Sequence, residues 1–233
     1  MAYRRALQPA ELPSQAELTA AMAGIGMGFA IAAPAREPNI EDTLLRASVE
    51  AMEHHDLRVL AILVGWFGIH SPFVNADRLT KIVAAQSSDR VRALWSALAR
   101  SQATDRRFAR LARIYDGRRV DALPSGTDFQ VKRRGEDERF AGSSLRVPSN
   151  LLRDRKGDVL APPDLARRHR AYRWRITIGP SYRADMWAAL DEEPTLSAAA
   201  LARRTYGSFA TAWHTRRDHL LVVAAVGQDR HRG

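Results

Sequence analysis

Apolar residues recur at helical spacing through the first half of the chain. They share one face in residues 40–56 and form a compact apolar run in residues 57–70. The i, i+3, i+4, i+7 spacing of an amphipathic helix returns further on, at Val91, Leu94, Trp95 and Leu98. We therefore expect residues 1–117 to form a helical N-terminal domain.

Turn-forming residues interrupt this pattern in the middle of the chain. In residues 118–165, Gly and Pro separate short β-like segments such as 129–131 and 145–147. This composition predicts an ordered, irregular and strand-poor region that connects two helical parts.

Three further helices with very short connections are predicted between residues 180 and 226. The first ends before Pro194, and Ser197 is a suitable N-cap for the second. Gly207 can take the left-handed turn that ends the second helix, and Ser208 can cap the third at once. Two helices joined by so short a turn have a helix–turn–helix layout.

A period of 100° per residue predicts the two faces of the third helix. Phe209, Trp213 and Leu220 share one sector and are expected to anchor the core. The opposite sector carries short polar side chains, namely Thr211, His214, Thr215 and Asp218, with Arg217 at its flank. Thr, His and Arg on an exposed helix can contact base edges and phosphates in a major groove.

Two β-like segments flank these helices. A strand at residues 176–178 would bury Trp174, Ile176 and Ile178 on one face, and residues 221–226 form an apolar run that ends at Gly227. With these strands, residues 166–233 resemble the winged helix–turn–helix domains of bacterial transcriptional regulators. The resemblance implies DNA binding through the third helix and a rudimentary wing, with residues 230–232 as a loose basic tail.

Positive charge is concentrated in the same half of the chain. The chain has 36 Lys plus Arg and 26 Asp plus Glu, a net charge of +10. Residues 1–117 hold 14 basic and 12 acidic residues, a net +2, which leaves +8 for residues 118–233. Arg is the preferred residue for phosphates and guanine edges, although codon usage in a GC-rich genome gives the same excess. An arginine-rich stretch at residues 167–175 lies directly before the three helices, where it could follow a phosphate backbone or simply keep a surface solvated.

These features predict a mainly α protein that is a sequence-specific double-stranded DNA-binding transcriptional regulator. A homodimer is expected, because a single small module rarely reaches regulatory affinity. The chain also looks like the antitoxin-type regulators of bacterial abortive-infection operons, and its nearly neutral N-terminal domain would then contact a protein partner. The expected base or phosphate contacts are Thr211, His214, Thr215 and Arg217, with Arg203, Arg204, Arg173 and Arg175 on the DNA backbone.

A fainter helix–turn–helix pattern occurs in the first half. Asn75 could cap a second helix, Ser87 and Ser88 could form the turn, and Trp95 lies on the face of a third helix. If the similarity is real, the chain carries the same plan twice.

A magnesium-dependent nuclease is one alternative. Asp128 and Lys132 flank the β-like segment, and Asp121 precedes it, a pattern similar to restriction-like nucleases in which two carboxylates hold Mg²⁺ and a Lys positions water. Gln130 stands where a second acid is usual, and a surface strand explains the same residues. A non-catalytic interaction scaffold of three helices is the other alternative.

Other kinds of chemistry find no support in the sequence. Without cysteine there is no disulfide, thiolate zinc site or Cys nucleophile, and His54 and His55 point about 100° apart on a helix. We expect no metal, no cofactor and no catalytic residue. Residues 18–35 and 59–69 are too weakly apolar or too short to span a bilayer, and no secretion signal follows Arg4 and Arg5, so a cytoplasmic protein is expected.

Overall fold

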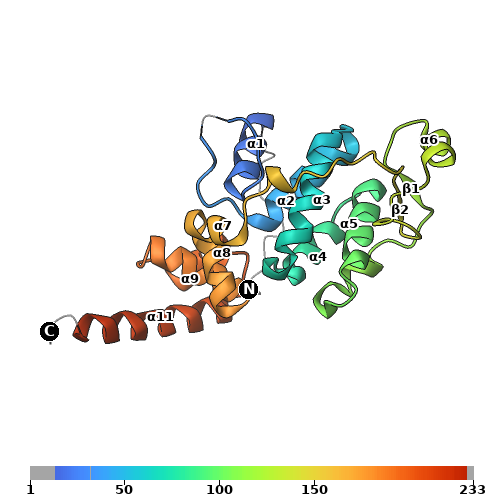
Figure 1. Cartoon of the computed structure of the whole chain (residues 1–233). Coiled ribbons are helices and arrows are strands. Elements are labelled where there is room, and N and C mark those ends of the chain that lie inside the picture. Colours follow the sequence, from blue (N-terminus) through green and yellow to red (C-terminus); the bar gives the residue numbers. More distant parts are fainter. Residues whose placement is uncertain (1–13, 32, 230–233) are drawn as a thin grey trace.

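The computed structural model describes residues 14–31 and 33–229, and the chain is mainly helical, as the sequence predicts (Figure 1). The helices of the first part are α1 (Gln15–Gly24), α2 (Ile40–Glu53), α3 (Leu57–His70), α4 (Ala76–Ala84) and α5 (Asp89–Ser101). The middle of the chain holds β1 (Val120–Asp121), α6 (Thr127–Arg134) and β2 (Leu145–Arg146). The last part is built from α7 (Pro162–Arg168), α8 (Arg170–Ile178), α9 (Tyr182–Glu192), α10 (Ala198–Arg204) and α11 (Phe209–Asp229). Short 3-10 turns lie between them, at η1 (Ser71–Phe73), η2 (Arg106–Phe108), η3 (Leu111–Arg113) and η4 (Lys156–Asp158).

Polar N-caps set where the first five helices begin. A side-chain oxygen accepts a hydrogen bond from the first turn in each case, at Ser14, Asn39, Asp56, Asn75 and Ser88. Such caps satisfy backbone N–H groups that a helix leaves unpaired at its start. The helix starts are therefore fixed locally, before any tertiary packing.

The main core lies between α2, α3 and α5. Phe67 packs edge-on against Trp95 and Phe108, with ring centroids 5.4 and 5.3 Å apart. The buried indole N–H groups are both satisfied: Trp66 donates to the Ile25 carbonyl at 2.7 Å, and Trp95 to the Ser48 hydroxyl at 2.9 Å. A core of this kind buries large aromatic area without leaving a polar atom unpaired.

The middle of the chain packs onto this same core. β1 pairs in parallel with β2, with Val120 opposite Leu145, beside α5. Phe140, Leu145 and Val147 are buried in the main core. The region is strand-poor, as predicted, but residues 129–131 belong to helix α6 rather than to a strand.

Both strands of the expected wing are helical. Residues 176–178 form the end of α8, with Ile176 and Ile178 exposed, and residues 221–226 continue α11 without a break. The apolar run follows directly on a capped helix with no Pro to stop it, and the part of the chain that the structure describes offers it no neighbouring strand. In residues 14–31 and 33–229 the C-terminal part therefore has no wing, and the predicted basic tail at 230–232 lies outside the described residues.

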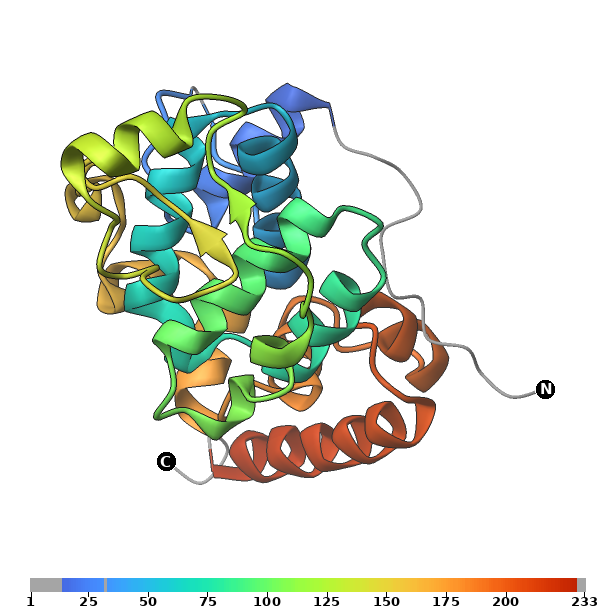
Figure 2. The same ribbon diagram turned by 90° about the vertical axis from the view of Figure 1, so that its right-hand side faces the viewer.

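A second, smaller core holds α9, α10 and α11 together. It contains Met186, Ala189, Leu190, Leu201, Ala202 and Ala212. The three helices lie at one end of the molecule, and α11 continues beyond the body in Figure 1 and runs along the lower edge in Figure 2. None of the helices in the described ranges is long and apolar enough to cross a membrane.

Candidate nucleic-acid interface

The turn between α10 and α11 spans only residues 205–208. Ser197 caps α10 by accepting from the Ala200 N–H at 3.2 Å, and the Ser208 hydroxyl accepts from the Thr211 N–H at 3.1 Å. The left-handed residue of the turn is Tyr206, with φ 56°, rather than the expected Gly207. Gly207 lies close to α9, and a Cβ there would require the terminal methyl of Met186 to shift. The predicted short connection between the two helices is present, with α9 packed against both of them.

The buried face of α11 differs from the predicted one. Ala212, Thr215 and His219 face the body, whereas Phe209, Trp213 and Leu220 are 48%, 50% and 47% exposed. The small Ala212 and Thr215 let α11 approach α9 and α10 closely, which large aromatic side chains at those positions would prevent. The prediction that Phe209, Trp213 and Leu220 anchor the core is therefore wrong.

Two of the four predicted base contacts on α11 are exposed. His214 is exposed beside the Trp213 ring, and Arg217 is exposed with its guanidinium 2.9 Å from Asp218. Thr215 is buried and donates its hydroxyl to the Thr211 carbonyl at 2.8 Å. Thr211 is half-buried, and its hydroxyl bonds to Ser208. The expectation that Thr215 reaches DNA is therefore corrected, because its only polar group points into its own helix.

Of the four arginines predicted to contact the DNA backbone, three are exposed and one is buried. Arg203 and Arg173 are exposed. Arg204 is exposed and forms ion pairs with Glu192 and Glu193. Arg175 is buried completely between Glu41 and Asp185, so it cannot contact a ligand in solvent and this prediction is wrong.

Arg175 instead joins the C-terminal helices to the body. Its guanidinium donates to Glu41 at 2.6 and 2.9 Å and to Asp185 at 2.8 and 2.9 Å. Burial lowers the pKa of Arg175, but the two carboxylates outweigh burial and raise it above the ordinary value. Burial raises the pKa of Asp185. A bidentate pair on both sides of one guanidinium satisfies most of its donors in a dry site.

A second arginine holds the helix–turn–helix itself. Arg78 of α4 is buried, pairs with Asp42 and lies 3.5 Å over the ring of Tyr206 in the α10–α11 turn. The Tyr206 hydroxyl hydrogen-bonds to Asp42. The turn is thus fixed to α2 and α4.

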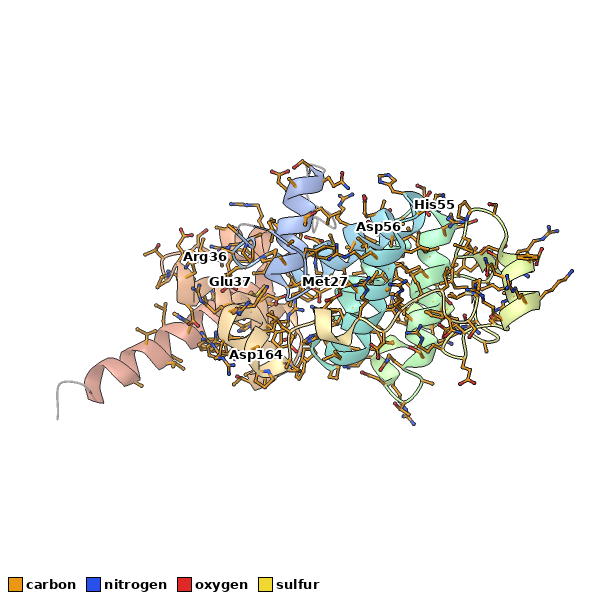
Figure 3. All side chains as sticks on the ribbon, turned by 45° about the horizontal axis from the view of Figure 1, so that its top comes forward. Met27, Arg36, Glu37, His55, Asp56 and Asp164 are labelled. Carbon is orange, nitrogen blue, oxygen red and sulfur yellow. The ribbon has the colours of Figure 1, made fainter. Side chains whose placement is uncertain are left out.

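Glu37 fixes the beginning of α8. Figure 3 shows Glu37 in the loop before α2, next to Arg36. Its carboxylate accepts from the backbone N–H of Arg170 at 2.9 Å, at the positive end of α8. Together with Arg175, this contact fixes the direction of α8 and of the helices that follow it.

The alternative nuclease site is neutralised by an arginine. Arg146 pairs with Asp121 at 2.8 Å and with Asp128 at 2.7 Å, and Lys132 lies on helix α6 rather than on a strand. The carboxylates that would hold Mg²⁺ are occupied by a guanidinium. Among the described residues no group of three or more His, Asp or Glu is placed to hold a metal ion.

The paired histidines also serve a local purpose. His54 pairs with Glu50 at 2.9 Å, and His55 lies beside Asp56 in the α2–α3 turn (Figure 3). They end a helix and do not converge on a common point.

Comparison of the chain with protein-family models, curated proteins and solved structures finds no match.

Proposed function

We propose that this protein binds double-stranded DNA through α10 and α11 and acts as a sequence-specific transcriptional regulator of the helix–turn–helix class. The observation that carries the proposal is the free face of the first turns of α11. Ala210, Trp213, His214 and Arg217 are exposed there, opposite the face that packs on the body.

The chemistry of this face suits a major groove. Arg217 can donate two parallel hydrogen bonds to guanine, His214 can meet a base edge or a phosphate, and Ala210 and Trp213 offer apolar contact to a thymine methyl group. Arg217 forms an exposed contact with the adjacent Asp218 and a ring contact with Trp213, 5.7 Å from its guanidinium. Exposed ion pairs contribute little, so Arg217 can exchange Asp218 for DNA.

Further exposed arginines lie on two of the neighbouring helices. Arg203 is exposed at the end of α10, and Arg173 is exposed on α8. These side chains would neutralise phosphates and position α11, without reading sequence themselves.

The proposal extends to an antitoxin-type role, in which α11 binds a promoter and the nearly neutral helical body binds a protein partner.

The test is a salt titration of binding to a labelled random-sequence duplex of about 30 base pairs. We expect the logarithm of the association constant to fall linearly with the logarithm of salt concentration, because phosphate contacts release counterions. Arg113→Ala, an exposed arginine on the body, serves as the matched control and should bind like the wild type. Absence of binding at low salt would leave the scaffold as the remaining class, and loss of the probe on addition of Mg²⁺ would identify a nuclease.

Selection from a random duplex pool then separates specific from non-specific binding. A regulator enriches one short motif, and the enrichment is lost in His214→Ala and Arg217→Ala. A pool that stays random would show that the protein coats DNA without reading it.

A further inference from the structure

The second half of α11 lies outside the body and is apolar on every side. Leu220, Leu221, Val222 and Val223 are 47%, 65%, 49% and 54% exposed, and the two alanines that follow are exposed as well. The segment 220–225 carries no charge. Figure 1 shows this end of α11 extending away from the other helices.

An exposed apolar segment of this kind is expected to pack against another surface. A helix that is apolar all round is normally buried, and an isolated helix of this length is marginal in water. Four consecutive branched apolar side chains also form a larger exposed patch than scattered surface residues do. The free chain therefore presents an interface.

We propose that segment 220–225 crosses the same segment of a second copy of this chain in an antiparallel pair. This dimer rests on the proposed function, because it uses the same helix to place two DNA-binding faces. Antiparallel crossing also aligns the two helix dipoles favourably.

The angular positions around α11 leave room for both contacts. At 100° per residue, Leu220, Val223 and Ala224 centre about 75° from the DNA-facing set of Ala210, Trp213, His214 and Arg217. They also lie about 100° from the body-facing set of Ala212, Thr215 and His219. The DNA-facing residues lie on the first turns of α11 and the dimer-facing residues on later turns, so one helix can contact the body, DNA and the second copy.

The length of α11 gives the spacing between the two DNA-binding faces. With the two-fold axis between Val223 and Ala224, Trp213 lies about ten residues away on each side. At a rise of 1.5 Å per residue, the two faces are about 32 Å apart. Two half-sites one helical turn apart need about 34–36 Å, so the crossing places both faces against one side of a duplex.

The crossing is short, which determines how strong the dimer is. An overlap of about ten residues on two narrow helices is smaller than the roughly 800 Å² per partner of a standard interface. We expect a dimer that dissociates in the micromolar range and that a duplex with two half-sites strengthens.

Cross-linking tests the geometry directly, since the natural chain has no cysteine. Ala224→Cys lies beside the two-fold axis and should give a covalent dimer on mild oxidation. Val222→Cys is exposed on the same turn but points away from the crossing, and it should stay monomeric. Equal cross-linking of both variants, or of neither, overturns the proposal.

Sedimentation equilibrium with Leu220→Glu gives an independent test. We expect the dimer dissociation constant to rise at least tenfold, whereas Phe129→Glu, at a more exposed apolar residue on α6, leaves it unchanged. A wild type that stays monomeric at all concentrations with intact DNA binding overturns the dimer alone. A dimer without DNA binding overturns the proposed function alone.

Discussion

Two regions of this protein share a local plan and differ in what covers their third helix. In α3–α4–α5, Asn75 caps the second helix, Leu79 follows four residues later, and Ser88 caps the third. In α9–α10–α11, Ser197, Leu201 and Ser208 stand in the same places. Both leucines are fully buried between their helices.

The third helices nevertheless have opposite surroundings. Trp95 on α5 is fully buried, whereas Trp213 on α11 is half exposed. α5 is covered by α2, η3 and the β1–β2 pair, while the main contacts of α11 are with α9 and α10. The same caps and turn therefore produce a core helix in one place and a free surface in the other, and only the free one is available to a ligand.

Replacing the two tryptophans should give the largest contrast. Trp95→Ala leaves a large cavity and removes a partner of Ser48, so we expect a loss of about 3–5 kcal/mol in the free energy of unfolding. Trp213→Ala should change it by no more than about 0.5 kcal/mol. Urea denaturation measures both. Equal losses would mean that α11 is covered in solution by its own body.

Breaking the Arg175 junction should destabilise the molecule by a similar or slightly smaller amount. Arg175→Ala leaves Glu41 and Asp185 buried without their cation, which costs about 3 kcal/mol or more. Arg173→Ala, two residues away and exposed, is the matched control and should be close to neutral. If both variants unfold like the wild type, the junction does not hold the C-terminal helices to the body.

The helical body should also lose stability in acid through His70. Its Nε2 donates to the Leu160 carbonyl at 3.0 Å and its Nδ1 accepts from the Tyr172 hydroxyl at 2.6 Å, and burial lowers the pKa of His70 to about 4. Since the unfolded chain takes up this proton first, stability falls as the pH drops from about 6.5 to 4, by about 2–3 kcal/mol. Urea denaturation of His70→Gln across this range should show a flatter pH dependence than the wild type. An unchanged pH dependence would contradict the assignment to His70.

On the C-terminal side, the expected effects concern binding rather than folding. If Arg217 donates two hydrogen bonds to a guanine, Arg217→Ala should weaken the free energy of binding by about 1–3 kcal/mol with the preferred sequence and by much less with random DNA. Fluorescence anisotropy with both duplexes checks the difference. An equal loss of affinity for both duplexes would mean that Arg217 contacts a phosphate rather than a base.

The smallest expected effect is that of Arg203→Ala. A phosphate contact at the end of α10 should weaken all sequences alike and lower the slope of the salt dependence by about one. An unchanged slope would remove Arg203 from the interface.

Much of the local structure could be predicted because it is encoded by neighbouring residues. Ser197 and Ser208 mark helix starts by hydrogen bonds within three residues, so α10 and α11 are readable from the chain. The wing could not be predicted correctly, because the apolar branched residues after Leu220 suit a strand or a helix equally. A strand needs a partner strand to pair with. Residues 221–226 directly follow a helix that has already begun at Phe209, so they continue it as a helix.

Tertiary contacts explain the remaining errors. The helical period and the size of the side chains favoured Phe209 and Trp213 for the core, but the close approach of α11 to its neighbours selected Ala212 and Thr215. Arg175 looked like part of a solvated basic stretch, because its partner Glu41 lies far away in the sequence. If residues 170–178 had been assigned to a helix, Arg175 would have been predicted on the same face as Tyr172, three residues earlier, and both are buried.

The unbroken course of α11 from Phe209 to Asp229 has a consequence for the kind of operator the proposed dimer can read. No flexible joint separates the turns that would enter the groove from the turns that would cross the second copy. Each added base pair moves a half-site by about 3.4 Å along the duplex and rotates it around the axis. A rigid dimer cannot follow that displacement, so it would tolerate a single spacer length and reject operators one base pair longer or shorter.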